Sequence, residues 1–465
     1  MKFTARDALN WLDSAELYGS GSEVFSGVGT DTRRLPPGCL FVPLRGENFD
    51  AHNFIEKAVA EGAAGFLFEH CEQLYGPALR VPDTRRALGQ LARGWRARFD
   101  LPLIAVTGSN GKTTVKDMIS AVLAESVGAE HCLATEGNFN NDIGVPLTVF
   151  RLDDCHRVAV LELGMNHPGE IEWLTKIAQP AIAIVNNAQR EHQEFLDGVE
   201  ATARENGAVF SGLPESGIAV FPGDDPCTPI WEALAGNRRV MRFGLSDISG
   251  QFDVWANPAA TPQAFDVFAD GDSGLSSVEV KLQIDGGHNV RNALAATAAC
   301  IAADIDLQTI AAGLAKFQPA NGRMQRVTSA VGADLINDTY NANPDSVLAA
   351  IDVLASKPVP RILVLGDMAE VGDKGPLFHR EVGEYARARG LQAIFATGPL
   401  SRETVKAFGK GAVHFKEIDA LSSAIRRFAR PGASILVKGS RSMRMERVID
   451  ALGQDNCAAE VTHAA

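Results

Sequence analysis

Residues 101–118 read LPLIAVTGSNGKTTVKDM, and this stretch constrains the fold more than any other part of the chain. A short apolar strand over 103–106 runs into a glycine-rich turn, and a helical pattern begins near Thr113. Gly108 and Gly111 let the backbone approach phosphate groups closely, and the helix N-terminus directs its unpaired N–H groups at them. The segment therefore predicts a strand–turn–helix cradle for the phosphates of a nucleotide.

The residues at the start of the predicted helix supply the chemistry of such a cradle. Lys112 can reach the β- and γ-phosphates, and Thr113 can hold Mg²⁺. The spacing G-x-x-G-K-T is two residues shorter than the general G-x-x-x-x-G-K-[ST] pattern, which narrows the class of P-loop protein. The alternative is a Gly-Lys-Thr turn at the start of an ordinary surface helix. The strand before the triplet and the helix after it disfavour that alternative.

The length of 465 residues predicts two to four domains. The first hundred residues contain strand signals at 39–44 and 65–68, a helical pattern over 53–62 and a charged helix over 91–100. In the middle of the chain, apolar runs are separated by stretches that suit helical crossovers and hence a parallel sheet; these runs are 158–164, 181–187 and 217–221. Short alternating runs between 244 and 285 predict a small antiparallel excursion.

A second α/β pattern begins after Arg323, with four dense apolar runs separated by helical segments; these runs are 333–340, 361–367, 392–398 and 434–440. We therefore predict an α/β protein of three domains. They are a small N-terminal α/β domain over 1–100, a central P-loop ATPase domain with a parallel sheet over 101–325, and a C-terminal Rossmann-like α/β domain over 326–465.

Composition excludes several other classes of protein. The net charge of −13 argues against a general nucleic-acid surface, which needs a basic stripe. The N-terminus lacks the apolar core of a signal peptide, and the longest apolar tract, 293–303, is too short to span a membrane and is expected to form a buried Ala-rich helix. The seven cysteines show no C-x-x-C spacing, so we expect reduced packing residues in a cytoplasmic protein.

Two residues beyond the phosphate loop lie where ligand groups are expected. Glu162 ends the apolar run 158–164, and strand ends of an open α/β sheet face the ligand crevice, so its carboxylate can bind Mg²⁺. The alternative is a solvated glutamate at the end of a strand. His192 follows the next run in a loop near the same edge, where an imidazole can ligate a metal or position a phosphate. Taken alone, such a histidine is more often a plain surface residue.

The C-terminal third contains a polar cluster, NDTYNANPDS, over 337–346. Placed directly after a strand, it could orient a ribose or an incoming nucleophile across an interdomain cleft. A turn that caps a helix at Asp345 or Ser346 is the structural alternative, and the two interpretations are compatible. Lys438 and Arg441, after the last strand signal, could hold a carboxylate.

Several segments together resemble the Mur ligases of peptidoglycan synthesis over nearly the whole chain. The segments with the most specific resemblance are 31–55, TGSNGKTT (107–114), GNFNNDIGVPLT (137–148), ELGMNHPGEI (162–171), GGHNVRNALAA (286–296), DTYNANPDS (338–346), LGDMAEVG (365–372) and KGSRSMRME (438–446). Within this family the resemblance implies an enzyme that uses ATP and Mg²⁺. It would join D-alanyl-D-alanine to the terminal carboxylate of UDP-N-acetylmuramoyl-tripeptide through an acyl phosphate. The resemblance leaves two forms of the tripeptide open, one ending in diaminopimelate and one ending in lysine.

The resemblance also implies roles for individual residues. The uridine diphosphate end of the nucleotide-sugar would meet the N-terminal residues Asp31, Thr32, Arg33, Arg45, Gly46 and His52. The muramoyl-peptide path toward the phosphate loop would be lined by Asn138, Asn140, Asn141 and Asp142. ATP would be bound by Gly108, Ser109, Asn110, Gly111, Lys112, Thr113, Thr114, His288, Asn289, Asn292, Arg323 and Asp338. The incoming dipeptide would be received by Tyr340, Asn341, Asn343, Lys438, Ser440 and Arg441. The Mg²⁺ ligands would be Thr113, Glu162 and His192, and the catalytic set Lys112, Glu162, His192 and Asn341.

One position departs from the family pattern. Related ligases usually carry, shortly after the histidine and just before a glycine, a lysine that is carbamylated and helps to hold a second metal. The matching residue here is Asn206, whose neutral amide cannot supply the charge of a carbamate. Either the second metal is held differently, with help from Glu205 or Glu194, or it binds more weakly.

Four rival functions follow from the same residues. A Mur-type ligase that adds a single amino acid and a folylpolyglutamate synthetase share the phosphate loop, but the segments 338–346 and 438–446 favour dipeptide addition. A P-loop motor or transport ATPase would need a partner-binding helical array or a basic channel. A non-catalytic nucleotide-sugar binding protein is suggested by Asn206 and opposed by Lys112, Thr113, Glu162 and His192. We expect a monomer without nucleic-acid partners or membrane insertion.

Overall fold

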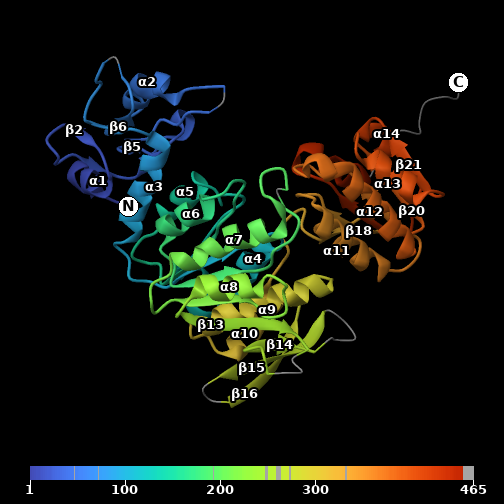
Figure 1. Cartoon of the computed structure of the whole chain (residues 1–465). Helices are drawn as coiled ribbons and strands as arrows, with labels where there is room; N and C mark the ends of the chain where they lie inside the picture. The colour runs from blue at the N-terminus through green and yellow to red at the C-terminus, as the bar shows by residue number, and fades with distance from the viewer. Residues whose placement is uncertain are drawn as a thin grey trace, which may run out of the picture.

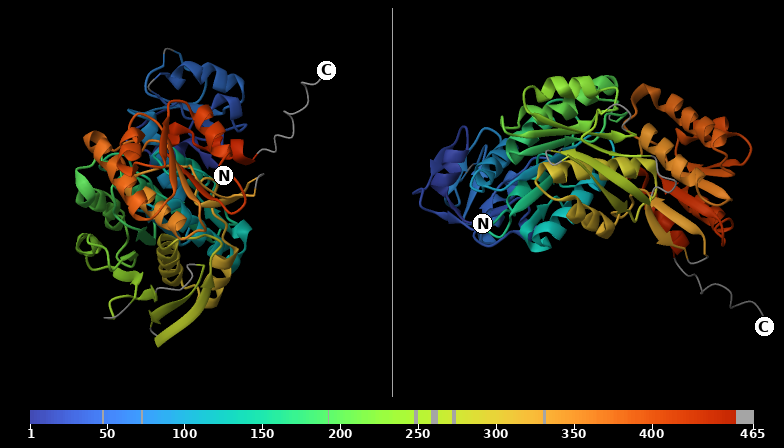
Figure 2. Two further views of the ribbon diagram at one scale, coloured as in Figure 1. Left: turned by 90° about the vertical axis from the view of Figure 1, so that its right-hand side faces the viewer. Right: turned by 90° about the horizontal axis from the view of Figure 1, so that it is seen from below.

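A computed structural model describes residues 1–46, 48–71, 73–191, 193–246, 250–257, 263–271, 274–329 and 332–453. Figure 1 shows three lobes that follow one another along the chain, and Figure 2 shows the first and last lobes at opposite ends of the middle one. Among the described residues, no helix is both long enough and apolar enough to cross a membrane. The α/β class predicted from the sequence is confirmed.

The N-terminal lobe is built on a five-stranded sheet in which only the edge strand β2 is antiparallel. In spatial order the strands are β2 (Glu16–Tyr18), β7 (Ala78–Arg80), β6 (Gly65–Phe68), β5 (Leu40–Phe41) and β4 (Val28–Gly29), with a separate pair formed by β1 (Phe3–Thr4) and β3 (Val24–Phe25). The helices are α1 (Ala5–Trp11), α2 (Ile55–Ala60) and α3 (Thr84–Arg96). Helix α3 begins earlier than predicted because Asp83 caps it by accepting a hydrogen bond from the Arg86 backbone.

The middle lobe contains a nine-stranded sheet. In spatial order its strands are β16 (Gly274–Lys281), β15 (Ala264–Gly271), β14 (Val254–Ala256), β13 (Arg239–Leu245), β12 (Ile218–Pro222), β11 (Ile182–Val185), β8 (Leu103–Thr107), β10 (Val158–Glu162) and β9 (Cys132–Ala134). Strands β9 to β14 pair in parallel, whereas β15 pairs antiparallel with both β14 and β16, so the predicted antiparallel excursion is confirmed.

Helices cover both faces of this sheet, as the alternation along its buried strands requires. They are α4 (Lys112–Val127), α5 (Gly144–Val149), α6 (Glu170–Ala178), α7 (Gly198–Ser211), α8 (Thr228–Ala235), α9 (Gly287–Ala302) and α10 (Leu307–Lys316). In β8, Ile104 and Val106 join the apolar cluster of α4, α9 and α10, while Leu103 and Ala105 join that of α3, α6 and α7. The predicted Ala-rich helix is α9, and its residues Ala293–Cys300 are buried.

The C-terminal lobe has a six-stranded sheet that is parallel except for the edge strand β17. Its spatial order is β17 (Gln325–Thr328), β18 (Asp334–Asp338), β22 (Ser434–Lys438), β19 (Arg361–Leu365), β20 (Ala393–Thr397) and β21 (Ala412–Phe415). The helices are α11 (Pro344–Ala355), α12 (Gly375–Ala388), α13 (Ser401–Phe408), α14 (Ile418–Arg426) and α15 (Glu446–Gly453). Figure 1 shows α11 on the side of this lobe that faces the middle lobe.

Candidate active site

The phosphate loop connects the central strand β8 to helix α4. Gly108 and Gly111 have φ angles of +130° and +82°, which side chains with a Cβ atom rarely adopt. A Cβ atom on Gly111 would lie 2.5 Å from Asn292 Oδ1. Both the backbone conformation and the close approach of α9 therefore require glycine at this turn.

Lys112, the first residue of α4, folds back over the loop. Its Nζ donates to the carbonyl oxygens of Gly108 at 2.6 Å and Ser109 at 3.1 Å, and pairs with Glu191 Oε1 at 3.0 Å. The Lys112 side chain is 14% exposed and the Glu191 side chain 10%. Lys112 thus holds a positive charge at the loop, and Glu191 balances that charge.

The residues after β11 hold the loop from one side. Asn187 accepts a hydrogen bond from the Asn110 backbone at 2.9 Å and donates to the Asn110 carbonyl at 2.9 Å. Asn186 donates to the same carbonyl at 2.7 Å and to Asn292 Oδ1 at 2.8 Å. The Gln189 backbone donates to Ser109 Oγ at 2.9 Å. The phosphate loop is therefore fixed by the residues that follow its neighbouring strand β11.

Glu162 is the last residue of β10 and is only 2% exposed. Its Oε1 accepts from Asn140 Nδ2 at 2.8 Å, while its Oε2 is buried without a hydrogen-bond partner among the described residues. A buried carboxylate oxygen without a partner is costly, and a cation would satisfy it. The prediction that this residue faces the ligand crevice agrees with its place at the end of the strand beside β8.

The C-terminal lobe contributes a second wall. The side-chain amides of Asn110 and Asn343 bond each other, with Asn343 Nδ2 donating to Asn110 Oδ1 at 2.8 Å. Lys438 Nζ, almost fully buried, lies 2.5 Å from Asp338 Oδ2 and donates to the Asn341 carbonyl at 3.0 Å. The Arg323 guanidinium lies 4.0 Å from the centre of the Tyr340 ring.

A second contact between the lobes lies beside this wall. Arg190, in the loop after β11, makes an ion pair with both carboxylate oxygens of Asp345, with Nη2 to Oδ1 at 2.6 Å and Nε to Oδ2 at 3.2 Å. The same guanidinium contacts Glu381 of α12 at 2.7 Å. The loop that holds the phosphate loop therefore also binds the C-terminal lobe.

Between the two walls lies a cavity of about 740 Å³. It is lined by the phosphate loop, the ends of β10 and β11, the start of α9 and the loops after β18 and β22. Burial lowers the pKa of His288, so this imidazole is neutral near pH 7. A cavity of this size with converging amides, cations and carboxylates can hold a polar ligand larger than one amino acid.

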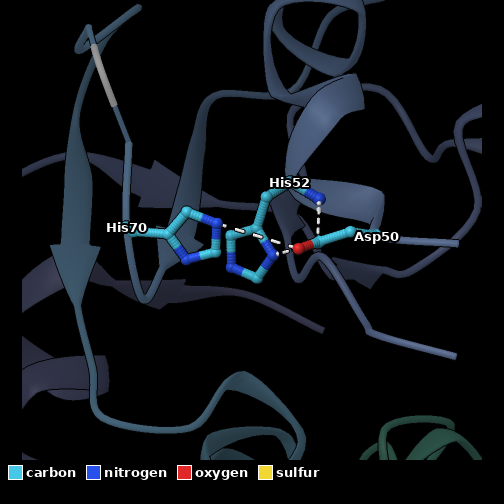
Figure 3. A group of neighbouring side chains, drawn as sticks. All are labelled: Asp50, His52 and His70. Atoms are coloured by element: carbon cyan, nitrogen blue, oxygen red, sulfur yellow. Dashed lines mark hydrogen bonds and ion pairs between the residues drawn. The ribbon is translucent and has the colours of Figure 1, made fainter. Parts of the chain in front are cut away.

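Asp50, His52 and His70 of the N-terminal lobe form a separate cluster, shown in Figure 3. His52 Nε2 accepts from the Glu69 backbone, so His52 Nδ1 carries the proton that bonds Asp50 Oδ1 at 2.6 Å. Arg45 donates to His70 Nδ1 and to Asp50 Oδ2, both at 2.9 Å. With these nitrogens engaged and a guanidinium in place, the cluster braces Arg45 rather than binding a metal.

Three family models match the chain in order: the Mur ligase family catalytic domain over residues 24–96, the Mur ligase middle domain over 106–300 and the Mur ligase glutamate ligase domain over 322–441. The UDP-N-acetylmuramoyl-tripeptide--D-alanyl-D-alanine ligase of Escherichia coli is 40% identical over 445 residues, which cover 95% of this chain and 96% of that protein. The chain belongs to the Mur ligase family. It is thus an ATP-dependent ligase that forms amide bonds, and the predicted enzyme class is confirmed.

Solved structures agree with this family. The crystal structure of MurF from Acinetobacter baumannii is 32% identical, with a TM-score of 0.89 over 98% of this Mur ligase and 99% of that chain. A second structure from the same organism, a UDP-N-acetylmuramoylalanyl-D-glutamyl-2,6-diaminopimelate--D-alanyl-D-alanyl ligase, is 31% identical, with a TM-score of 0.85 over 97% and 98% of the two chains. The predicted three-domain Mur ligase fold is therefore confirmed.

The structure brings most of the predicted site residues of this Mur ligase to the cavity. Its lining includes Ser109, Asn110, Gly111, Lys112, Thr113, Thr114, Asn138, Asn140, Asn141, Asp142, Glu162, His288, Asn289, Asn292, Arg323, Asp338, Tyr340, Asn341, Asn343, Lys438 and Arg441. Gly108 and Ser440 do not line it: Ser440 is buried, and its hydroxyl joins the Ala369 backbone to the Ala342 carbonyl. His192 lies outside the described residues.

The N-terminal residues predicted to meet the nucleotide-sugar lie away from the cavity lining. His52 belongs to the cluster of Figure 3, and Arg45 donates to Asp50 and His70 of that cluster. The Gly46 backbone N–H donates to the Phe49 carbonyl. Asp31 caps the single turn Thr32–Arg34. Its carboxylate also accepts hydrogen bonds from the Arg33 guanidinium, which lowers the pKa of Asp31 to about 2. These roles stay predictions.

Several cavity residues were missed from the sequence. Asn186, Asn187 and Gln189 surround the phosphate loop, and Arg85 pairs with Asp142 through two bonds of 2.5 and 2.6 Å. The two asparagines directly end an apolar run beside the phosphate-loop strand, which is a usable signal. Arg85 and Glu191 carry no comparable signal, because only the folded chain brings them to the site.

Proposed function

We propose that this Mur ligase uses ATP to join D-alanyl-D-alanine to the terminal carboxylate of a UDP-N-acetylmuramoyl tripeptide in peptidoglycan synthesis. The observation that carries the proposal is the shared cavity, in which the phosphate loop of the middle lobe faces the polar loops after β18 and β22. The name of the E. coli relative, which aligns over nearly the whole chain, supports the same reaction.

The reaction proceeds in two steps. The tripeptide carboxylate attacks the γ-phosphorus of ATP, which releases ADP and forms an acyl phosphate. The dipeptide amine then attacks the acyl carbon, loses a proton and displaces inorganic phosphate. Carboxylate and triphosphate repel each other, and the Lys112 ammonium reduces this repulsion and stabilises the transferring phosphoryl group. Closure of the cavity would exclude water, which otherwise hydrolyses the acyl phosphate.

The same site fits one Mg²⁺ ion. The unpartnered Oε2 of Glu162 and the hydroxyl of Thr113, both on the cavity lining, are oxygen donors of the kind that this ion prefers. We propose these two residues as ligands, with His192 as a third. A bound Mg²⁺ would neutralise phosphate charge during phosphoryl transfer.

The remaining roles follow the cavity geometry and the family resemblance. His288, Asn289, Asn292, Arg323 and Asp338 would contact the nucleoside and phosphates of ATP; the amides at 138, 140 and 141 would guide the tripeptide. Tyr340, Asn341, Asn343, Lys438 and Arg441 would receive the dipeptide, and the braced Arg45 would meet the diphosphate of the nucleotide-sugar. We propose domains over 1–100, 101–325 and 326–465, and a monomer that acts in the cytoplasm.

Release of inorganic phosphate from ATP, followed by a coupled assay, tests this function. Release should require the UDP-muramoyl tripeptide and D-alanyl-D-alanine together. Equal release with a single D- or L-amino acid would instead identify a ligase that adds one residue. ATP turnover with neither substrate would indicate a motor-type ATPase and would contradict the proposal.

The third residue of the tripeptide is tested in the same assay. One A. baumannii structural relative is named for a substrate that contains 2,6-diaminopimelate. We therefore propose diaminopimelate at this position and expect a higher kcat/KM for that tripeptide than for the lysine form. The opposite ratio would assign the lysine form.

A further inference from the structure

Asn206, the residue that departs from the family pattern, lies beneath the phosphate loop. It belongs to α7 and has no exposed surface. Its Oδ1 accepts hydrogen bonds from Thr107 Oγ1 at 2.6 Å and from the Gly108 backbone N–H at 2.9 Å. Thr107 ends strand β8 and Gly108 begins the loop, so the amide joins α7 to the junction between the two.

The orientation of the amide follows from its partners. A backbone N–H can only donate, so the atom that faces Gly108 must be the oxygen. Asn206 Nδ2 is then buried without a partner among the described residues. Both lone pairs of Oδ1 are used, and the amide carries no charge. Asn206 therefore does not fit the role of a metal ligand.

Glu205 and Glu194 are the two residues that could hold a second metal in place of a carbamylated lysine. The Glu205 carboxylate accepts from the Gly169 backbone at 2.9 Å and from the Ile171 backbone at 3.0 Å, so it caps the start of α6. That engagement disfavours Glu205 as a ligand of a second metal, because each of its carboxylate oxygens already accepts a backbone hydrogen bond. The Glu194 backbone lies against the loop at Gly372 of the C-terminal lobe. This contact does not involve its carboxylate, whose role as a metal ligand stays a prediction.

A short chain of contacts runs from Asn206 to the functional lysine. Asn206 holds the N–H of Gly108, and the carbonyl of the same glycine accepts from Lys112 Nζ at 2.6 Å. Gly108 has a φ angle of +130° and would have wide conformational freedom without outside contacts. Fixing the N–H on one side of its Cα restricts the carbonyl on the other side.

We propose that Asn206 is a positioning residue that fixes Gly108, and through it Lys112, by hydrogen bonds from beneath the phosphate loop. This ligase therefore orders its loop with an uncharged amide and needs no carbamate made from CO₂ at this position. The proposal builds on the proposed function, but its primary test is nucleotide binding, which requires no acceptor substrate.

The first experiment measures the affinity for ADP by calorimetry, with EDTA and with Mg²⁺, for wild type, Asn206→Ala and the control Thr202→Val. Thr202 is equally buried on α7, but among the described residues its hydroxyl bonds only the Gly198 carbonyl of its own helix. Loss of the two bonds in Asn206→Ala should weaken ADP binding roughly tenfold, with and without Mg²⁺. Thr202→Val should bind ADP as wild type does. Unchanged ADP affinity in Asn206→Ala would overturn the proposal.

Two further variants keep the test decisive if Asn206→Ala does not fold. Thr107→Val removes one of the two donors while keeping the shape of the side chain, and Thr107→Ser keeps the hydroxyl. Thr107→Val should weaken ADP binding, and Thr107→Ser should restore it. In a double-mutant cycle, the losses from Thr107→Val and Asn206→Ala should be less than additive, because they break one shared bond. Additive losses would contradict the shared contact.

The role of CO₂ is tested separately. Wild-type phosphate release should be the same in bicarbonate-free and bicarbonate-containing buffer. Asn206→Lys should lose ADP affinity, and bicarbonate should not restore it, because a longer charged side chain cannot make both bonds in this buried place. Recovery of Asn206→Lys in bicarbonate would overturn the proposal. Reduced ADP affinity in Asn206→Ala without any dipeptide ligation by wild type would refute the proposed function and leave the positioning role intact.

Discussion

The Lys112 ammonium is held in place by its partners at the phosphate loop. It has two backbone carbonyls and one carboxylate as partners, and all of them belong to the phosphate loop or the loop beside it. Glu191 occupies one donor position of Lys112, so a phosphate that approaches this ammonium must compete with the Glu191 carboxylate. The ammonium is therefore placed by the loop before any substrate binds.

Lys112→Ala should lower kcat for phosphate release by about 10²- to 10³-fold, the usual cost of removing one preorganised group that stabilises developing charge. Lys176→Ala is the matched control, because Lys176 is half exposed and its ion pair is with Glu172 on the same helix, α6. The coupled assay should show Lys176→Ala activity within about twofold of wild type, because exposed ion pairs contribute little to stability. Near-normal turnover of Lys112→Ala would remove this lysine from the mechanism.

His379 gives the stability of the protein a defined pH dependence. It is fully buried in α12, accepts from the Met368 backbone at Nε2 and donates to the Gly375 carbonyl at Nδ1. Burial lowers the pKa of His379 below its usual value of 6.5. Near pH 6 the unfolded chain therefore binds a proton that the folded chain does not, and the free energy of unfolding falls as the pH drops.

Urea denaturation at pH 7.5 and pH 5.5 should show a lower free energy of unfolding at the acid end. His379→Gln should be less stable at pH 7.5 but should lose part of this pH dependence. The exposed variant His167→Gln should keep it. An equal slope in His379→Gln and wild type would show that this imidazole does not contribute.

At the scale of elements, the two helices α4 and α6 offer a direct comparison. Each has a glycine at its N-cap in the same left-handed conformation, Gly111 at φ +82° and Gly169 at φ +89°. A Cβ atom on Gly169 would meet nothing within 4 Å, whereas one on Gly111 would meet Asn292 and Asn186. The two positions share backbone strain and differ in packing.

Both Gly111→Ala and Gly169→Ala should lose about 1–2 kcal/mol of stability from the positive φ angle. Gly111→Ala should in addition bind ADP much more weakly, because α9 must move away from the loop. Thermal unfolding and calorimetry of the two variants would measure the two effects separately. Equal ADP affinity in both would show that the contact with Asn292 does not matter.

The features that could be predicted from the sequence are those that leave a pattern in neighbouring residues. The strands over 158–162 and 434–438 are buried on both faces, so they appear in the sequence as dense apolar runs. The spacing of the glycines locates the phosphate loop. The two-residue strand β4 is too short to show an alternating apolar pattern, whereas β5 lies within the predicted strand 39–44. The pairing of Lys112 with Glu191, 79 residues away, depends on how the loop after β11 lies against the phosphate loop. The burial of Asn206 depends on the packing of α7 against β8. Local residue patterns carry no signal for such contacts.

At the scale of the whole molecule, the middle and C-terminal lobes meet through a shared apolar cluster and through polar contacts, among them the pairing of Asp285 with Lys357 and Arg326. Arg190 binds both Asp345 and Glu381, and its guanidinium lies 5.1 Å from the centre of the Phe378 ring. The side-chain amides of Asn110 and Asn343 add two hydrogen bonds. Because the cavity lies between these lobes, their docking decides whether the two halves of the site face each other.

Arg190→Ala should raise KM for D-alanyl-D-alanine about tenfold, since hydrogen bonds between charged groups contribute about 1.5–3 kcal/mol each. Arg389→Ala serves as the control, because Arg389 pairs with Asp352 inside the C-terminal lobe alone. Small-angle X-ray scattering should show a larger radius of gyration for Arg190→Ala only. A KM and a radius equal to those of wild type would show that Arg190 does not hold the lobes together.

The Asn110–Asn343 pair has a thermodynamic consequence of its own. One amide belongs to the loop that cradles phosphate, and the other caps the first helix to follow β18 in the C-terminal lobe. The affinity for nucleotide and the docking equilibrium of that lobe are therefore linked functions. If bound nucleotide changes the equilibrium constant for lobe docking by some factor, docking changes the affinity for nucleotide by the same factor. ATP binding and lobe movement therefore share a single coupling free energy.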